Sequence, residues 1–120
     1  MMTETLYERL GGTEGCNQIA NDLIDIHLAN PAISPRYVDS DPAALKNGAA
    51  TFFIAGTGGP SVYEGKNMLD THRGMNISGE EFLAVLDDAI QALQKNNVGQ
   101  REQEEVLFIL YSMKPEIAGV

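Results

Sequence analysis

The sequence YEGKNMLDTHRGMNI, residues 63–77, contains His72, one of only two histidines in the chain. Glycines at positions 65 and 74 enclose a piece long enough for about two turns of helix. In such a helix Met68 lies one turn before His72 on the same face, so the imidazole is expected to share its side with a soft apolar residue. Taken alone, the pattern favours a core histidine bonded to a backbone carbonyl. Whether His72 instead has a functional role depends on the rest of the sequence.

The composition is that of a small single-domain protein. The chain has 120 residues, 43% of them hydrophobic, which suits one core that can enclose a small ligand. Its longest apolar runs are a few residues, so none spans a bilayer, and residues 1–10 lack the pattern of a signal peptide. The single cysteine, Cys16, cannot form an internal disulfide and is expected to pack within a helix interface. We therefore expect residues 1–120 to form one cytoplasmic domain that does not contact membranes.

The charge balance excludes one class of partner. Seventeen acidic residues stand against eight basic ones, which gives a formal net charge of −9. Such a surface repels phosphate backbones, so nucleic acid is not an expected partner.

The apolar spacing predicts an all-α fold. Every long periodic segment follows helical spacing, and none alternates as a strand does. A short helix over residues 3–10 should stop at two glycines, after which Thr13 caps a second helix that ends at Asn30 and Pro31. Residues 32–40, with prolines in and beside them, should be irregular. The inward stripe of the second helix is Ile19, Ala20, Leu23, Ile24, His27 and Leu28.

Further helices complete the pattern. Asp41 and Pro42 open a third helix, and Ser78 with Glu81 forms a capping box that starts a strongly amphipathic one. The inward face of the third helix is Leu45, Ala49, Phe52, Phe53 and Gly56. The inward face of the amphipathic helix is Phe82, Val85, Leu86, Ala89, Ile90 and Leu93, and a last helix presents Val106, Ile109, Leu110 and Met113.

Several kinds of site are excluded by the residues around their motifs. A phosphate loop of the GxxxxGK[ST] type fails because residues 65–66 are followed by Asn67, and because Pro60 stands where the first glycine belongs. Zinc needs three or four ligands at set spacing, and the chain offers two histidines and one distant cysteine. Asp87 and Asp88 are expected on a solvated face, opposite the apolar stripe of their helix, rather than in acid–base chemistry.

One histidine is enough to hold a haem, because the macrocycle supplies four nitrogens and the protein need supply only one axial imidazole. A short helix between glycines would let His72 approach the iron, and apolar side chains elsewhere would enclose the ring. These side chains are Met68, Phe82, Val85, Phe52 and Phe53. The residues permit such a site without requiring it.

Three motifs, in this order, resemble those of a known family. They are TLYERLGG at residues 5–12, GGPSVYEGKNM at 58–68, and His72 followed by RGMNI. Together they resemble the truncated haemoglobins, specifically their first group, over nearly the whole chain. The resemblance implies a two-over-two helical sandwich, a truncated globin with a shortened first helix and a much reduced proximal helix. It also implies that His72 is the proximal ligand of a pentacoordinate iron in haem b.

On the ligand side of the haem, this chain departs from the family pattern. The tyrosine that usually bonds to bound oxygen is matched by Ile24, and distal positions that are often polar are matched by Leu45 and Ala49. Tyr37 is the best remaining donor, and the alternative is a packing aromatic with its hydroxyl at the rim. His27 is expected to pack in the core or at the rim, with direct or water-mediated contact to the ligand as the alternative.

The resemblance also implies the remaining haem contacts. Tyr63 and Lys66 are expected beside the propionates. The full set of expected haem contacts is His72, Tyr37, Phe52, Phe53, Tyr63, Lys66, Met68, Ile77, Phe82, Val85 and Leu110.

The function implied by the resemblance is that of a haem-binding globin. Reversible binding of oxygen, carbon monoxide or nitric oxide, with oxygen binding or carriage as the default, is the first expectation. A redox enzyme such as a nitric oxide dioxygenase is one alternative, and it would need a separate reductase because the sequence shows no flavin or nicotinamide motif. A gas-sensing or haem-poor interaction module is another. The chain is expected to be a monomer or a weak homodimer.

Overall fold

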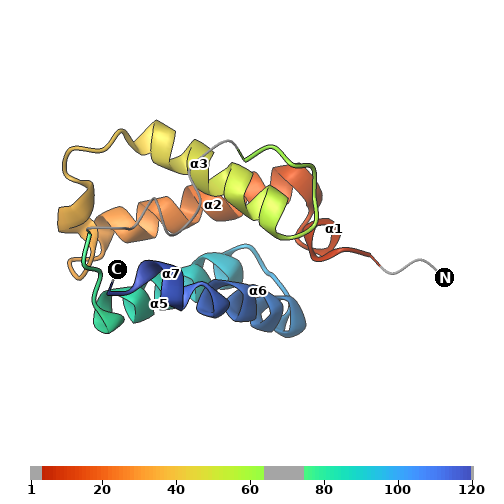
Figure 1. The fold of residues 1–120 in the computed structure, drawn as a ribbon. Helices are drawn as coiled ribbons and strands as arrows, with labels where there is room; N and C mark the ends of the chain where they lie inside the picture. Colours follow the sequence, from red (N-terminus) through yellow and green to blue (C-terminus); the bar gives the residue numbers. More distant parts are fainter. Residues whose placement is uncertain (1–3, 64–74, 120) are drawn as a thin grey trace.

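The computed structural model of the chain describes residues 4–63 and 75–119, and this part is helical (Figure 1). One isolated bridge, between Ile77 and Ala118, is the only β-type pairing among these residues. The helices are α1 (Leu6–Arg9), α2 (Gly12–Ala29), the 3₁₀ helix η1 (Ser34–Tyr37), α3 (Pro42–Gly56), α5 (Gly79–Lys95), α6 (Gln100–Ser112) and α7 (Lys114–Ile117). The predicted all-α class is confirmed.

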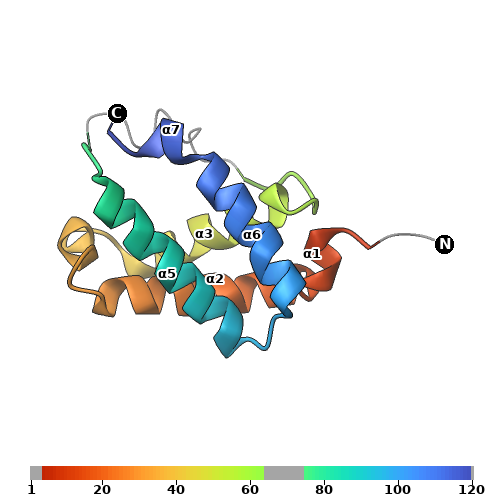
Figure 2. The same cartoon turned by 90° about the horizontal axis from the view of Figure 1, so that it is seen from below.

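Two pairs of helices lie one over the other (Figure 1). α2 packs against α3 in one layer, α5 packs against α6 in the second, and α2 also contacts α5 across the layers. Seen from below, α5 and α6 lie across the α2 and α3 pair (Figure 2). This is the predicted two-over-two sandwich. Across residues 4–63 and 75–119, none of the helices is both long enough and apolar enough to span a bilayer.

One predicted helix start is wrong. Thr13 does not cap α2, because the helix already begins at Gly12 after Gly11, whose φ of 100° is a left-handed conformation that glycine adopts without strain. The Thr13 hydroxyl instead lies 2.5 Å from the hydroxyl of Tyr7. The side chain therefore links α2 to α1 rather than satisfying a backbone donor.

Three other boundaries also differ from the prediction. The segment 32–40, expected to be irregular, contains η1, and α7 follows the predicted last helix. Pro35 and Pro115 stand in the first turns of these two short helices, where a fixed φ and a missing N–H cost nothing. α1 covers only four residues instead of the expected 3–10.

The core lies where α1, α2, α3, α5 and α6 meet. Cys16 is fully buried there, and burial raises the pKa of its thiol, as expected for a packing residue. The core cluster consists of Leu6, Leu10, Cys16, Ile19, Leu23, Phe53, Ile54, Ala89, Ala92, Leu93 and Val106.

α3 presents apolar residues on two sides. Ala50 and Ile54 are buried against the rest of the protein. Leu45, Ala49 and Phe52, predicted as part of the inward face, are only half-buried and border a cavity instead. The fold therefore leaves a second apolar surface between the helix layers.

Candidate functional site

Two cavities adjoin each other between the layers. The first, here called the His27 cavity, has a volume of about 340 Å³ and is bordered by residues of α2, η1, α3, α5, α6 and α7. The second, the Phe82 cavity, has a volume of about 310 Å³ and lies toward η1 and the start of α5. Both are bordered by Tyr37, Leu45, Val85, Leu110 and Ile117. Because they share these walls, the two cavities are adjacent, and together they offer a mainly apolar space.

The structure brings the described candidate residues together around this space. The candidates that border the His27 cavity are Ile24, Tyr37, Leu45, Ala49, Phe52, Phe53, Tyr63, Val85 and Leu110. Those that border the Phe82 cavity are Tyr37, Leu45, Ile77, Phe82, Val85 and Leu110. Three further candidates, His72, Lys66 and Met68, lie outside the described residues.

Some residues of the site were missed by the sequence reasoning. Ile117 borders both cavities from α7, and Arg36 and Glu81 border the Phe82 cavity. The sequence signal for α7 was Pro115, a residue favoured in the first turn of a helix. For Arg36 no sequence signal exists, because its position depends on how η1 folds back beside α5.

A buried polar cluster joins α2 to α5. His27 Nδ1 lies 2.7 Å from Asp88 Oδ2, and these side chains are only 5% and 3% exposed. Asn30 Nδ2 donates to the same carboxylate, at 3.1 Å from Oδ1 and 3.2 Å from Oδ2. The prediction that Asp88 faces solvent is therefore wrong, although Asp87 is exposed as predicted. Two neighbouring donors make burial of this carboxylate tolerable.

Burial also changes the proton affinity of these groups. Desolvation lowers the pKa of His27 below its ordinary value, although the neighbouring Asp88 acts in the opposite direction. The ring of Tyr37 lies parallel to that of His27, with centroids 6.1 Å apart. Burial raises the pKa of the Tyr37 phenol, so the hydroxyl keeps its proton at neutral pH.

Within the part of the chain that the structure describes, few polar side chains border the His27 cavity. They are His27, Tyr37 and Tyr63. Tyr63 makes an edge-to-face contact with Phe52, at 5.7 Å between ring centroids. Ile24, only 6% exposed, contributes hydrocarbon where the family pattern implied a tyrosine.

A charged pair stands at the edge of the Phe82 cavity. Arg36 Nη2 donates to Glu81 Oε1 at 2.8 Å, and its Nη1 donates to the carbonyl of Met75 at 3.0 Å. The bond from Arg36 is the main reason that the pKa of Glu81 falls to about 2. Glu81 also accepts from the backbone N–H of Ser78 in the capping box. This pair therefore connects η1 to the first turn of α5.

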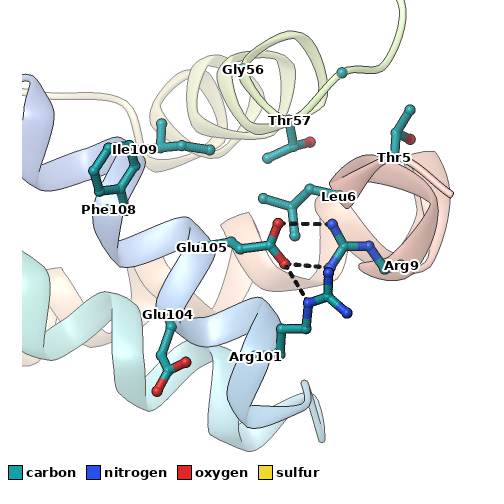
Figure 3. Close-up of a pocket in the computed structure, with 11 residues that line it drawn as sticks. Thr5, Leu6, Arg9, Gly56, Thr57, Arg101, Glu104, Glu105, Phe108 and Ile109 are labelled. Carbon is teal, nitrogen blue, oxygen red and sulfur yellow. Dashed lines mark hydrogen bonds and ion pairs between the residues drawn. The ribbon is translucent and has the colours of Figure 1, made fainter. Parts of the chain in front are cut away.

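A larger hollow, about 510 Å³, lies outside this space, where α1, the end of α3 and α6 meet (Figure 3). Arg9 donates to both carboxylate oxygens of Glu105, with Nη2 at 2.9 Å from Oε1. Arg101 lies beside Arg9, with its Nε 3.8 Å from Glu105 Oε2 (Figure 3). Arg9, Arg101 and Glu105 are thus paired in this open groove, and the bond from Arg9 to Glu105 attaches α1 to α6.

Comparison with known proteins identifies the family. Residues 5–118 match the family model described as "Bacterial-like globin". The group 1 truncated hemoglobin of Mycolicibacterium paratuberculosis is 29% identical over 95% of this chain and 84% of its own length. That of Nostoc sp. is 26% identical, over 94% and 96%.

Solved structures show the same fold. The Fe(III) form of truncated hemoglobin from Tetrahymena pyriformis is 24% identical and superposes with a TM-score of 0.93, over 98% of this chain and all of the other. A 2/2 hemoglobin from Synechococcus sp., in the cyanomet state and with covalently attached heme, is 25% identical and superposes with a TM-score of 0.85 over 92% and 94% of the chains. The chain thus belongs to the bacterial-like globins and has the fold of a truncated hemoglobin.

Proposed function

We propose that the protein binds one haem b across the adjacent His27 and Phe82 cavities through His72, and that it reversibly binds oxygen or another diatomic gas. The observation that supports this most is the mainly apolar space between the two helix layers of a globin fold. A bound haem supplies an iron with one open position for a gas ligand.

The residues around this space fit an apolar group. Phe52, Val85 and Leu110 are half-buried, although they point between the helix layers rather than to the outer surface. Covering such side chains stabilises a complex by roughly 25 cal/mol for each Å² of apolar surface removed from water. The cavity walls therefore gain from an apolar guest such as a haem.

The apolar lining influences which gas is held. Bound oxygen carries partial negative charge and is stabilised by a hydrogen-bond donor, whereas carbon monoxide gains little from one. With Ile24, Leu45 and Ala49 at the family-matched distal positions, Tyr37 is the donor that we propose for bound oxygen. Carbon monoxide should accordingly be favoured over oxygen more than in a relative with a tyrosine in place of Ile24.

Oxygen binding or carriage in the cytoplasm is the function proposed, and a nitric oxide dioxygenase is the alternative. The dioxygenase reaction turns nitric oxide, oxygen and one electron into nitrate, so it needs a reductase partner. Nitrate formation in the presence of a supplied reductase, at a rate far above that of free haem, would favour the enzyme.

The haem assignment is tested by absorption spectroscopy of purified protein. The wild-type protein should give a Soret band and a reduced-minus-oxidised spectrum of a b-type haem. His72→Gly should lose or loosen the haem, and free imidazole should restore the band because it replaces the missing ligand. A His72→Gly variant with wild-type spectrum and wild-type haem retention would show that another residue is the axial ligand.

A further inference from the structure

The His27 and Asp88 pair lies between two hollows. On one side, His27 borders the cavity named after it. On the outer side of α2 and α5, Asp88 and Asn30 border an open hollow of about 430 Å³. His27 belongs to α2 and Asp88 to α5, so their bond joins two helices that contact each other across the layers. A hydrogen-bonded chain of side chains therefore extends from an open surface to the ligand side of the proposed haem site.

The hydrogen bonds determine which nitrogen of His27 carries the proton. A carboxylate accepts hydrogen bonds, and that of Asp88 is already bonded to the amide of Asn30. The bond at 2.7 Å therefore requires His27 Nδ1 to be the donor. In the neutral ring the proton is then absent from Nε2, which presents a lone pair. Nδ1 is bonded to Asp88 and the ring borders the cavity. Nε2 is therefore the ring nitrogen that a ligand in the cavity can reach.

We propose that His27 Nε2 is a proton acceptor for small, weakly acidic ligands that enter the cavity, and that Asp88 positions it. A ligand HX gives its proton to Nε2, the H–X electron pair stays on X⁻, and X⁻ is left to bind the haem iron. The imidazolium that results keeps its Nδ1–H bond to Asp88, so the pair becomes neutral overall. Hydrogen cyanide, hydrogen sulfide and hydrogen peroxide belong to this chemical class. The inference rests on the proposed haem function.

The surroundings of the ring favour this role. An apolar cavity admits the neutral acid far more readily than the free anion, so the proton has to be removed inside. Burial lowers the pKa of His27, which keeps the base unprotonated at neutral pH. Asp88 faces the ring from α5 and Tyr37 faces it from η1, and Arg36 acts on Tyr37 from beside it. Among the described residues of α3, α6 and α7 that border the cavity, none is charged.

The association of cyanide with the ferric holoprotein, followed by stopped-flow absorption, tests the proposal. His27→Leu removes the base and should slow association by about a hundredfold or more, the usual size of a general-base contribution. His27→Gln should slow association similarly. Its amide still donates to Asp88, so this variant serves as the test if His27→Leu does not fold. Carbon monoxide association with the ferrous protein transfers no proton, so it should change much less.

Asp88→Asn tests the positioning role. An asparagine that accepts from Asn30 would donate its own amide to His27 Nδ1 and move the ring proton to Nε2, as in the wrong-tautomer variant of a serine protease triad. Long-range ¹H–¹⁵N spectra should report an Nδ1–H imidazole in the wild type and an Nε2–H imidazole in Asp88→Asn, with slow cyanide association. Asp87→Asn, the same change at an exposed neighbour, should alter neither.

The outcomes separate this proposal from the haem function on which it rests. A wild-type protein without a Soret band would overturn both. A normal Soret band with cyanide association equal in the wild type, His27→Leu and His27→Gln would overturn only the role of His27. An Nε2–H imidazole in the wild type would contradict the roles given to both His27 and Asp88, whereas slow association in Asp87→Asn as well would contradict the role given to Asp88.

Discussion

At the scale of single residues, Asp88 determines the polarity of the cavity although it does not border the cavity itself. By accepting from His27 Nδ1, it leaves an acceptor rather than a donor on the other ring nitrogen. His27 in this form offers no N–H to bound oxygen. Tyr37, whose phenol keeps its proton because burial raises its pKa, is therefore the donor that we propose for bound oxygen.

Replacing Tyr37 by phenylalanine should therefore affect oxygen selectively. The ring remains to pack against His27, but a hydrogen bond worth about 1 to 2 kcal/mol is lost, so oxygen should dissociate roughly five to thirty times faster. Carbon monoxide dissociation should change little. Flash photolysis and stopped-flow displacement measure both rates. Equal rates of oxygen dissociation in the wild type and in Tyr37→Phe would show that the Tyr37 hydroxyl points away from the ligand.

The position of Asp88 could have been predicted from spacing alone. It lies three residues after Val85 and four before Ala92, so the three share one face of α5. From the sequence, Asp88 was instead grouped with Asp87, opposite the apolar stripe of the helix, and this led to the wrong prediction. The hydrogen-bond partners of Asp88 could not be predicted from the sequence, because Asn30 and His27 are separated from it by 58 and 61 positions.

At the scale of elements, the capping box of α5 was predictable from the local sequence, whereas the cap of α2 and the tertiary contacts were not. The Ser78 and Glu81 capping box follows from four consecutive residues, and the structure contains both of its bonds. The start of α2 was misplaced because Gly11 turns the chain before Thr13 can act as a cap. The connection of α5 to η1 through Arg36 has no local signature at all.

The capping box predicts a measurable loss of stability. Ser78→Ala removes the oxygen that accepts from the Glu81 backbone N–H, at 3.0 Å, and should cost about 1 kcal/mol. Urea unfolding of the holoprotein measures this as a lower midpoint with an unchanged slope. Ser61→Ala, at an exposed position outside the helices, should stay within about 0.5 kcal/mol of the wild type. Equal losses in both variants would show that the box does not stabilise α5.

At the scale of the whole molecule, periodicity and family resemblance contributed different things. The 3.6-residue spacing was enough for the helical class, and the motifs at residues 5–12 and 58–68 supplied the arrangement of the layers. A cavity cannot be inferred from spacing, because an apolar side chain that meets a ligand has the same pattern as one that meets another helix. The half-buried faces of α3 and α5 became distinguishable from the core only in three dimensions.

The stability of the folded protein should decrease on mild acidification partly through His27. Burial lowers the pKa of this ring in the folded state, whereas the unfolded chain keeps the ordinary value of about 6.5. Below that pH the unfolded chain binds a proton at His27 before the folded protein does. The free energy of unfolding therefore falls by up to about 1.4 kcal/mol per pH unit, until the pH reaches the pKa of His27 in the folded protein. Stability is unaffected by this group well above pH 6.5.

Urea midpoints of the wild type and His27→Gln at pH 7.5, 6.5 and 5.5 measure this effect. The wild type should lose more stability than the variant, while Glu81, with a pKa of about 2, stays ionised throughout and contributes equally to both. Parallel pH profiles would mean that the ring has the same proton affinity in the folded and unfolded states.

The hydrogen-bonded trio of His27, Asn30 and Asp88 has an evolutionary consequence. Replacing one member leaves a buried polar group without a hydrogen-bond partner and lowers the free energy of unfolding by about 1 to 3 kcal/mol. That is a large part of the roughly 5 to 15 kcal/mol by which a typical domain is stable. A lineage cannot easily exchange these residues one at a time. Among descendants of a common ancestor, the three positions should therefore be inherited or replaced together, and a sequence alignment should show them as a co-varying set.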